Sequence, residues 1–176
     1  MHVKGKGVIG VLFCLWIGCF GIAAVCSGAE APSSPETLVR ALQQVPVFQR
    51  LDKDQLHKVA EIAELVQRKD GDLIIEQGKR AEKMAIALDS EVRIRINGEN
   101  VRVLPVNSLV GEIEFLEDVP ATADVVLVSK SRVVLLNHKG FQQVMDADPS
   151  LGYRVMVEIA RMEANRLRMN NQRQAR

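Results

Sequence analysis

The spacing of hydrophobic positions after residue 35 predicts two helices, then a run of short strands, then a last helix. Residues 36–45 have helical spacing, and Asp52 opens a second helix because Gln55, three positions later, completes a capping box. The buried side of this second helix is expected to consist of four apolar residues, Leu56, Val59, Ala60 and Ala63. Two short helices therefore precede the strands.

Alternating hydrophobicity predicts strands in the middle of the chain. In residues 92–96 three apolar residues alternate with Arg93 and Arg95, so we expect the apolar side chains to face the core and the arginines to face solvent. Asn97 and Gly98 then predict a tight hairpin turn. Further apolar strands are expected at residues 84–88, 101–104, 125–128 and 133–136. Such a series is typical of a β-roll or jelly roll.

Helical spacing returns from Ser150 onward. Four apolar residues recur on one face of this last helix, Val155, Ile159, Met162 and Met169. This face packs either against its own domain or against a partner, and Arg166, which interrupts it, weakens a seam between two copies. Self-association through the helix is therefore a hypothesis. The basic residues near the end of the helix are expected to be exposed to solvent, where their charges suit the negative end of the helix dipole.

Residues 1–29 have the pattern of an export signal. Lys4 and Lys6 precede an uncharged run over residues 8–26, and small residues follow it. The run is 19 residues long, just enough to cross a hydrocarbon core of ~30 Å, so an uncleaved membrane anchor is the alternative, ahead of lipidation. Cleavage near Ala29 would give an exported, periplasmic protein, and an anchor would also leave the domain outside the cytoplasm.

Charge and residue chemistry exclude several functions. The net charge is +1, which points to no polyanionic partner. All three cysteines lie within the predicted signal. His57 and His138 are too far apart in the pattern for a metal cluster, and the chain has no nucleophile motif and no phosphate-gripping loop. We therefore expect a protein that is not an enzyme and that uses no metal and no cofactor.

A pair of motifs lies among the predicted strands. Gly111 and Glu112 are followed, eight residues later, by residues 120–124, with the sequence Pro-Ala-Thr-Ala-Asp. Together with residues 71–78 and the strands, they resemble the cyclic nucleotide-binding domain of the catabolite activator and protein kinase A regulatory families. The resemblance covers about residues 46–165. It implies a mainly β fold with flanking helices (α+β), a β-roll or jelly roll with N-terminal helices and a C-terminal helix.

The chain is expected to divide into four parts. The residues at 31–35 predict a linker over residues 30–35 after the signal, and the cyclic nucleotide-binding-like domain is expected over residues 36–149. The C-terminal helix and a basic tail then occupy residues 150–176.

In the resembled family the two motifs form a cassette that wraps a cyclic phosphate and a ribose. The resemblance assigns ligand contact to six residues, Gly111, Glu112, Ala121, Thr122, Ala123 and Asp124. Glu112 would accept a hydrogen bond from a ribose hydroxyl, and Gly111 would let the backbone approach the ligand. Ala121, however, stands where the family has an arginine, and Asp124 stands where it has a threonine.

The missing arginine is expected to weaken phosphate binding strongly. Breaking a buried charge pair of this kind costs ~2–5 kcal/mol, which is roughly 30-fold to several thousand-fold in affinity. Asp124 is expected to add repulsion. Four basic residues are the nearest replacements in sequence, Lys79, Arg80, Lys83 and Arg132.

Two functions fit these expectations. The first is an exported, non-catalytic interaction or regulatory module that does not bind cyclic AMP or cyclic GMP in the usual way and that binds an unidentified protein or a second copy. The alternative is a receptor for a small ligand, a cyclic nucleotide included, with an altered pocket. DNA binding is not expected, because no helix-turn-helix follows the last helix.

Overall fold

The structure is a computed structural model, and it describes residues 35–175. The predicted signal or anchor at residues 1–29 and all but the last residue of the linker lie outside the described residues. Within the part of the chain that is described, no helix is both long enough and apolar enough to cross a membrane.

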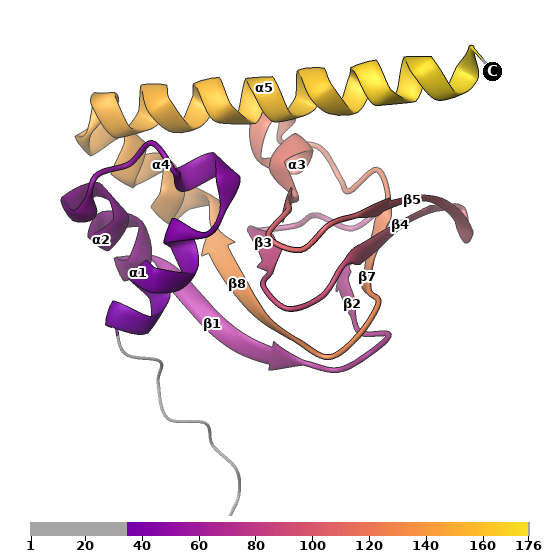
Figure 1. Cartoon of the computed structure of the whole chain (residues 1–176), viewed down its shortest axis with the longest axis horizontal. Helices are drawn as coiled ribbons and strands as arrows, with labels where there is room; N and C mark the ends of the chain where they lie inside the picture. The colour runs from indigo at the N-terminus through magenta and orange to yellow at the C-terminus, as the bar shows by residue number, and fades with distance from the viewer. Residues whose placement is uncertain (1–34, 176) are drawn as a thin grey trace, which may run out of the picture. The chain divides into compact units, whose positions relative to one another are not determined.

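The described residues form two four-stranded antiparallel sheets (Figure 1). The first sheet has the order β1-β8-β3-β6 and consists of β1 (Ala63–Arg68), β8 (Ser131–Asn137), β3 (Lys83–Ala87) and β6 (Leu109–Val110). The second has the order β2-β7-β4-β5 and consists of β2 (Leu73–Ile75), β7 (Asp124–Leu127), β4 (Val92–Ile96) and β5 (Glu99–Leu104). The predicted jelly-roll architecture with flanking helices is confirmed.

Helices lie before, within and after the strands. The first group is α1 (Pro35–Gln43), the 3-10 helix η1 (Pro46–Phe48) and α2 (Lys53–Glu61). The short α3 (Glu112–Glu117) lies between β6 and β7, and α4 (His138–Ala147) and α5 (Pro149–Gln174) end the described chain. The sequence analysis did not predict α4. Its start is marked by Asn137, whose side chain accepts a hydrogen bond from the Gly140 N–H at 3.0 Å.

The first sheet separates two hydrophobic cores. One face of β3 and β8 presents Met84, Ile86 and Leu136 to the helices, where Phe48 and Phe141 meet edge to face at 6.2 Å. The opposite face packs toward the second sheet through smaller residues, which include Ala85, Ala87 and Val133. Side chains alternate between the two faces of a strand, so each strand supplies both cores.

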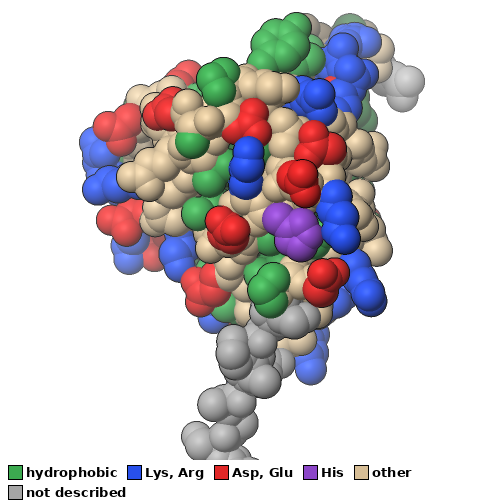
Figure 2. Space-filling view, turned by 90° about the vertical axis from the view of Figure 1, so that its left-hand side faces the viewer, with side chains coloured by type: hydrophobic (Ala, Val, Ile, Leu, Met, Phe, Trp, Pro, Cys, Tyr) green, Lys and Arg blue, Asp and Glu red, His purple; other side chains and the backbone are tan. Residues whose placement is uncertain are grey.

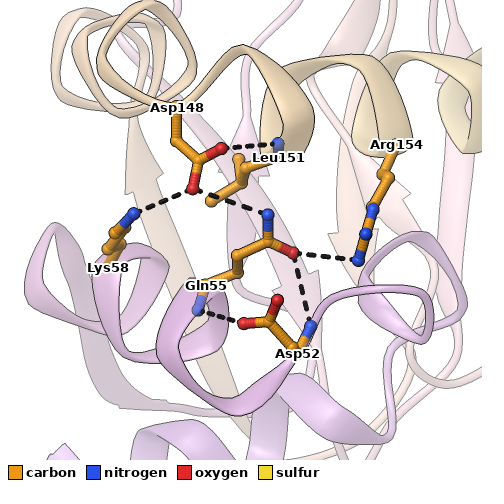
Figure 3. Close-up of polar contacts among 6 residues, drawn as sticks. All are labelled: Asp52, Gln55, Lys58, Asp148, Leu151 and Arg154. Atoms are coloured by element: carbon orange, nitrogen blue, oxygen red, sulfur yellow. Dashed lines mark hydrogen bonds and ion pairs between the residues drawn. The ribbon is translucent and has the colours of Figure 1, made fainter.

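A polar cluster joins α2 to the start of α5 (Figure 3). The predicted capping box is present, because Asp52 accepts from the Gln55 N–H at 2.9 Å. Asp148 accepts from Lys58 Nζ at 2.8 Å and from the Leu151 N–H at 3.0 Å, so it caps α5 while it pairs with α2. On this helical end of the molecule, acidic, basic and hydrophobic side chains are interspersed (Figure 2).

Two local expectations were wrong. Ala63 does not extend the buried side of α2, because α2 ends at Glu61 and Ala63 pairs with Leu136 in the first sheet. In β4 the arginines do not simply face solvent: Arg95 is half-buried because it pairs with Asp124, and Ile96 at the hairpin end is 40 % exposed.

The predicted hairpin between β4 and β5 is confirmed. Asn97 and Gly98 have φ angles of 52° and 83°, the left-handed values that a two-residue turn of this kind requires.

Candidate functional site

A cavity of about 510 Å³ lies between the second sheet, α3 and the C-terminal half of α5. Its wall is mainly aliphatic, and the strands contribute Ile75, Ile94, Ile96, Val101, Leu104 and Val125. Five charged residues also line it, Arg102, Glu112, Glu114, Glu163 and Arg166. A concave, mostly apolar site with a few converging polar groups is the usual form of a small-molecule site.

Gly111 forms the tight entry to α3 at the base of this cavity. Its φ is 84°, and a Cβ at this position would lie 3.0 Å from Ile75 Cδ1 and 3.2 Å from Met84 Cα. Both the backbone conformation and the close approach of β3 therefore require glycine. From the sequence, this glycine was expected to allow a ligand to approach, whereas its close neighbours in the structure belong to the chain itself.

Glu112 is buried, with 3 % of its surface exposed. One carboxylate oxygen, Oε1, accepts from the guanidinium of Arg166, which also donates to Glu163 at 2.7 Å and to the Leu109 carbonyl at 2.7 Å. The other oxygen, Oε2, has no hydrogen-bond partner among the described residues. Burial raises the pKa of Glu112 to about 7, although the charge of Arg166 acts in the opposite direction.

Glu114 occupies the second half of the cassette. Its side chain is buried, and its Oε1 accepts from the Thr122 N–H at 3.2 Å. Thr122 and Ala123 line the cavity beside it. An anionic carboxylate therefore lies against the turn that in the family wraps a phosphate. Glu114 was not predicted from the sequence, although it is a second acidic residue in the first turn of a very short helix.

Ala121 is buried in the second hydrophobic core and is not among the residues that line the cavity. Its N–H donates to the Lys79 carbonyl at 2.8 Å, and its carbonyl accepts from the Gly78 N–H at 2.7 Å. These bonds fix the turn to the loop after β2. The Ala121 position is therefore structured, but no cationic side chain projects from it.

The expectation that Asp124 adds a negative charge to the pocket was wrong. Asp124 begins β7 outside the cavity wall, where it accepts from the Gln77 N–H at 2.8 Å and from Arg95 at 3.1 Å. Arg95 therefore balances its charge within the second sheet.

The four basic residues considered as replacements pair elsewhere. Lys79 pairs with Glu76, Arg80 with Asp118, Lys83 with Glu64 and Arg132 with Asp89, and none of the four lines the cavity. The cations that line it are Arg102 and Arg166. The sequence signal for Arg166 was its interruption of the apolar face of the last helix.

The predicted partner face of α5 is divided. Val155 and Ile159 are buried in the domain's own core, and Met162 packs partly against it. Met169 is 55 % exposed. Of this face, only the Met169 end is accessible to a partner, so self-association through α5 stays a prediction about that end.

Comparison with known proteins gives a consistent result. Residues 65–148 match the cyclic nucleotide-binding domain family. Over 109 residues, 59 % of the chain, the sequence is 33 % identical to the cAMP-dependent protein kinase regulatory subunit of Blastocladiella emersonii. The match covers 27 % of that protein, so the chain corresponds to about a quarter of its length.

Solved structures share the fold. The regulatory subunit of a cAMP-independent protein kinase A from Trypanosoma brucei superposes with a TM-score of 0.65 at 26 % identity, over 74 % of this chain and 46 % of that one. A cyclic nucleotide-binding domain from Methylobacillus flagellatus gives 0.69 at 14 % identity, over 79 % and 81 % of the two chains. The resemblance predicted from Gly111, Glu112 and residues 120–124 is confirmed: residues 65–148 match the cyclic nucleotide-binding domain family, and the fold is shared with solved domains of that family, among them a protein kinase A regulatory subunit.

Proposed function

We propose that this domain is a non-catalytic regulatory or interaction module that does not bind cyclic AMP or cyclic GMP in the family's usual way. The observation that carries the proposal is the carboxylate of Glu114 on the Thr122 N–H. A cyclic phosphate brought to this turn would meet a buried negative charge instead of an arginine.

The charges around the cavity support this proposal. Both lining cations are engaged away from the Thr122 turn, because Arg166 binds Glu112 and Glu163, and Arg102 donates to the Arg166 carbonyl at 3.2 Å. Three carboxylates and two cations line the cavity, and of the two cations only Arg102 has no carboxylate partner among the described residues. A phosphate would enter a site whose lining has a net negative charge, which is unfavourable in a low-dielectric cavity.

A relative offers a parallel. A triple mutant of the Trypanosoma brucei protein, in which a glutamate, a threonine and a valine become alanine, arginine and alanine, is described as bound to cAMP in the A site. That glutamate lies seven positions before the threonine, and Glu114 lies seven positions before Ala121. This spacing suggests which two changes to make in the present chain.

The test is calorimetric titration of the full chain with cyclic AMP and cyclic GMP. We expect no binding heat from the unchanged protein and micromolar binding from Glu114→Ala combined with Ala121→Arg, because the double variant removes an anion and supplies a phosphate-binding fork. Glu117→Ala combined with Ala121→Arg is the matched control, since Glu117 lies on the same helix but is exposed. Micromolar binding by the unchanged protein would refute the proposal.

A second candidate function is reception of a different small ligand. The mostly apolar cavity, whose lining includes the buried residue Glu112, favours it. Among similar structures, the regulatory subunit of a cAMP-independent protein kinase A from Trypanosoma cruzi is described as bound to guanosine. Ligand reception and protein interaction are compatible, because the same α5 both lines the cavity and presents exposed residues.

We further propose that the domain acts outside the cytoplasm, on the basis of the residue pattern at 1–29. Mass spectrometry of the protein recovered from its native host is expected to find an amino terminus near Glu30. An intact Met1 on protein in the membrane fraction would favour the anchor instead, and an intact Met1 on cytosolic protein would contradict both. The interaction partner is proposed to contact the exposed end of α5 around Met169.

A further inference from the structure

We propose that a second cavity, which is lined by residues of both sheets, binds a carboxylate with an apolar hydrocarbon body. This intersheet cavity measures about 430 Å³, and its lining comes from β1, β2, β3, β8 and the loop between β2 and β3. Of its lining residues, only Ile75 also lines the cavity beside α5. The inference is therefore independent of the function proposed for the cassette.

Arg68 supplies the cation that would hold the carboxylate. Three basic residues line the intersheet cavity, Arg68, Arg80 and Lys83. Arg80 pairs with Asp118, and Lys83 pairs with Glu64. The exposed side chain of Arg68 has no ion pair and no hydrogen bond among the described residues. A guanidinium that is not engaged within the protein can donate to both oxygens of a carboxylate.

The charge of the lining favours an anion. Glu82 is the single acidic residue among the described lining residues, so three cations accompany one carboxylate. The acidic partners of the two paired cations are themselves exposed, Asp118 to 89 % and Glu64 to 56 %. Exposed ion pairs of this kind are weak, so Arg80 and Lys83 can exchange their partners for a bound anion at little cost.

The rest of the lining requires an apolar body. Ala85 of β3 and Leu135 of β8 pair in register and face the second core, and both line the intersheet cavity. The residues of β2, Leu73, Ile74 and Ile75, complete the apolar lining. Leu73 is 44 % exposed. A hydrocarbon chain in the cavity would remove this apolar surface from water, which is favourable in proportion to the area covered.

The register of the first sheet sets the cation apart from the apolar residues. Arg68 pairs with Ser131 at the end of β1, whereas Leu135 pairs with Glu64 of the same strand. Four residues of a strand span roughly 13 Å. The intersheet cavity therefore has a free cation at one end and an apolar floor away from it, and this arrangement matches a carboxylate that carries a hydrocarbon chain.

The test is calorimetric titration of the full chain with hexanoate, octanoate, dodecanoate and palmitate, each below the concentration at which it aggregates. We expect affinity to rise about three- to fourfold for each added methylene until the cavity is filled, and then to level off. Octanol and octylamine should bind more weakly than octanoate, and acetate should give no binding heat. A plateau at octanoate would assign a soluble carboxylate metabolite, and a plateau at palmitate would assign a fatty acid released from lipid.

Arg68→Glu locates the carboxylate in the cavity. Reversal of this exposed charge removes an attraction and adds a repulsion of similar size, so octanoate should bind roughly 2- to 30-fold more weakly while octanol is unaffected. Lys69→Glu makes the same charge change at the next residue, which does not line the cavity, and should leave octanoate binding within about twofold. Ala81→Phe, which fills the cavity from the loop before β3, should abolish binding of both compounds.

Four outcomes would overturn the inference. The first two concern the unchanged protein, and they are silence toward every carboxylate of the series and equal binding of octanoate and octanol. The others are equal effects of Arg68→Glu and Lys69→Glu, and octanoate binding that survives in folded Ala81→Phe. Because Arg68 is exposed, Arg68→Glu is expected to fold, and it tests the site even if Ala81→Phe does not.

Discussion

The two halves of α5 are held to the domain by different forces. In the first half, Val155 and Ile159 are buried in the core, and Asp148 caps the helix start. In the second half, every residue from Leu167 to Gln172 is exposed, and Arg166 provides the polar attachment. The first half of α5 is therefore held by hydrophobic packing, and the second half, which lines the cavity, is held by a buried charge pair.

The carboxylates that attach the two halves respond to their surroundings in opposite directions. The hydrogen bond from Lys58, together with the Leu151 N–H, lowers the pKa of Asp148, whose side chain is 17 % exposed, to about 2. Burial raises the pKa of Glu112 to about 7, despite its arginine partner. Both groups bind a cation, so the difference shows that desolvation, rather than the presence of a partner, decides the sign of the shift.

The largest effect is expected from Arg166→Gln at about pH 8. Removal of one partner leaves the Glu112 carboxylate buried and unpaired, so the free energy of unfolding in urea should fall by about 3–5 kcal/mol. Arg161→Gln, an exposed arginine of the same helix, should cost less than about 0.5 kcal/mol. Replacement of both Glu112 and Arg166 by leucine should recover most of the loss, and a double variant as unstable as Arg166→Gln would contradict the argument.

Ile159→Ala and Leu167→Ala compare the two halves directly. Ile159 is 1 % exposed, so its truncation leaves a cavity and should lower the free energy of unfolding by about 2–5 kcal/mol. Leu167 is 61 % exposed, and its truncation should change the value by less than about 0.5 kcal/mol. Equal losses in chemical denaturation would mean that both halves are anchored by packing.

The pH dependence of stability should isolate Glu112. Its pKa is raised from 4.5 to about 7 in the folded state, so its stabilising contribution is fully present below about pH 4.5 and is lost as the pH rises through about 7. The unfolding free energy of the unchanged protein minus that of Glu112→Gln should therefore fall by about 1–3 kcal/mol as the pH rises from about 4.5 to above 7. A difference that is constant with pH would contradict the raised pKa.

Asp148 should give the smallest effect, with the opposite sign. Its pKa is lowered from 3.8 to about 2, so its contribution is present above about pH 3.8 and is lost as the pH falls through about 2. The melting temperature of the unchanged protein should exceed that of Asp148→Asn at pH 5, and the two should converge near pH 2. Asparagine keeps the helix cap, so the comparison reports the charge. A gap that widens on acidification would contradict this assignment.

Local patterns predicted much of the fold because local hydrogen bonds decide those features. The capping box of Asp52 and Gln55 spans three residues, and the Asn97-Gly98 turn lies between adjacent strands. The helix α4 was not predicted, although Asn137 is a good cap. The helix α4 begins directly after β8. Over so few residues, the positions of the apolar side chains do not distinguish the end of a strand from the start of a helix.

Which charged residues pair in the site could not be predicted from local sequence patterns. Arg166 lies 54 positions from Glu112, and Arg95 lies 29 positions from Asp124. The replacement cations were therefore sought near the cassette in sequence, whereas the cavity takes its cations from α5 and β5. Charge alone did not indicate that Asp124 pairs with Arg95 instead of lining the cavity.

The sequence by itself determined the fold family, the Gly111-Glu112 pair of the cassette and the absence of an arginine at Ala121, because these depend on residue identity at fixed spacing. Only the tertiary structure decided that Glu114 lies on the phosphate turn, that Arg166 holds Glu112 and that one carboxylate oxygen remains free. The physical reason is that burial and long-range pairing set the charge state and the partners of an ionisable group, and neither is encoded within a short stretch of chain.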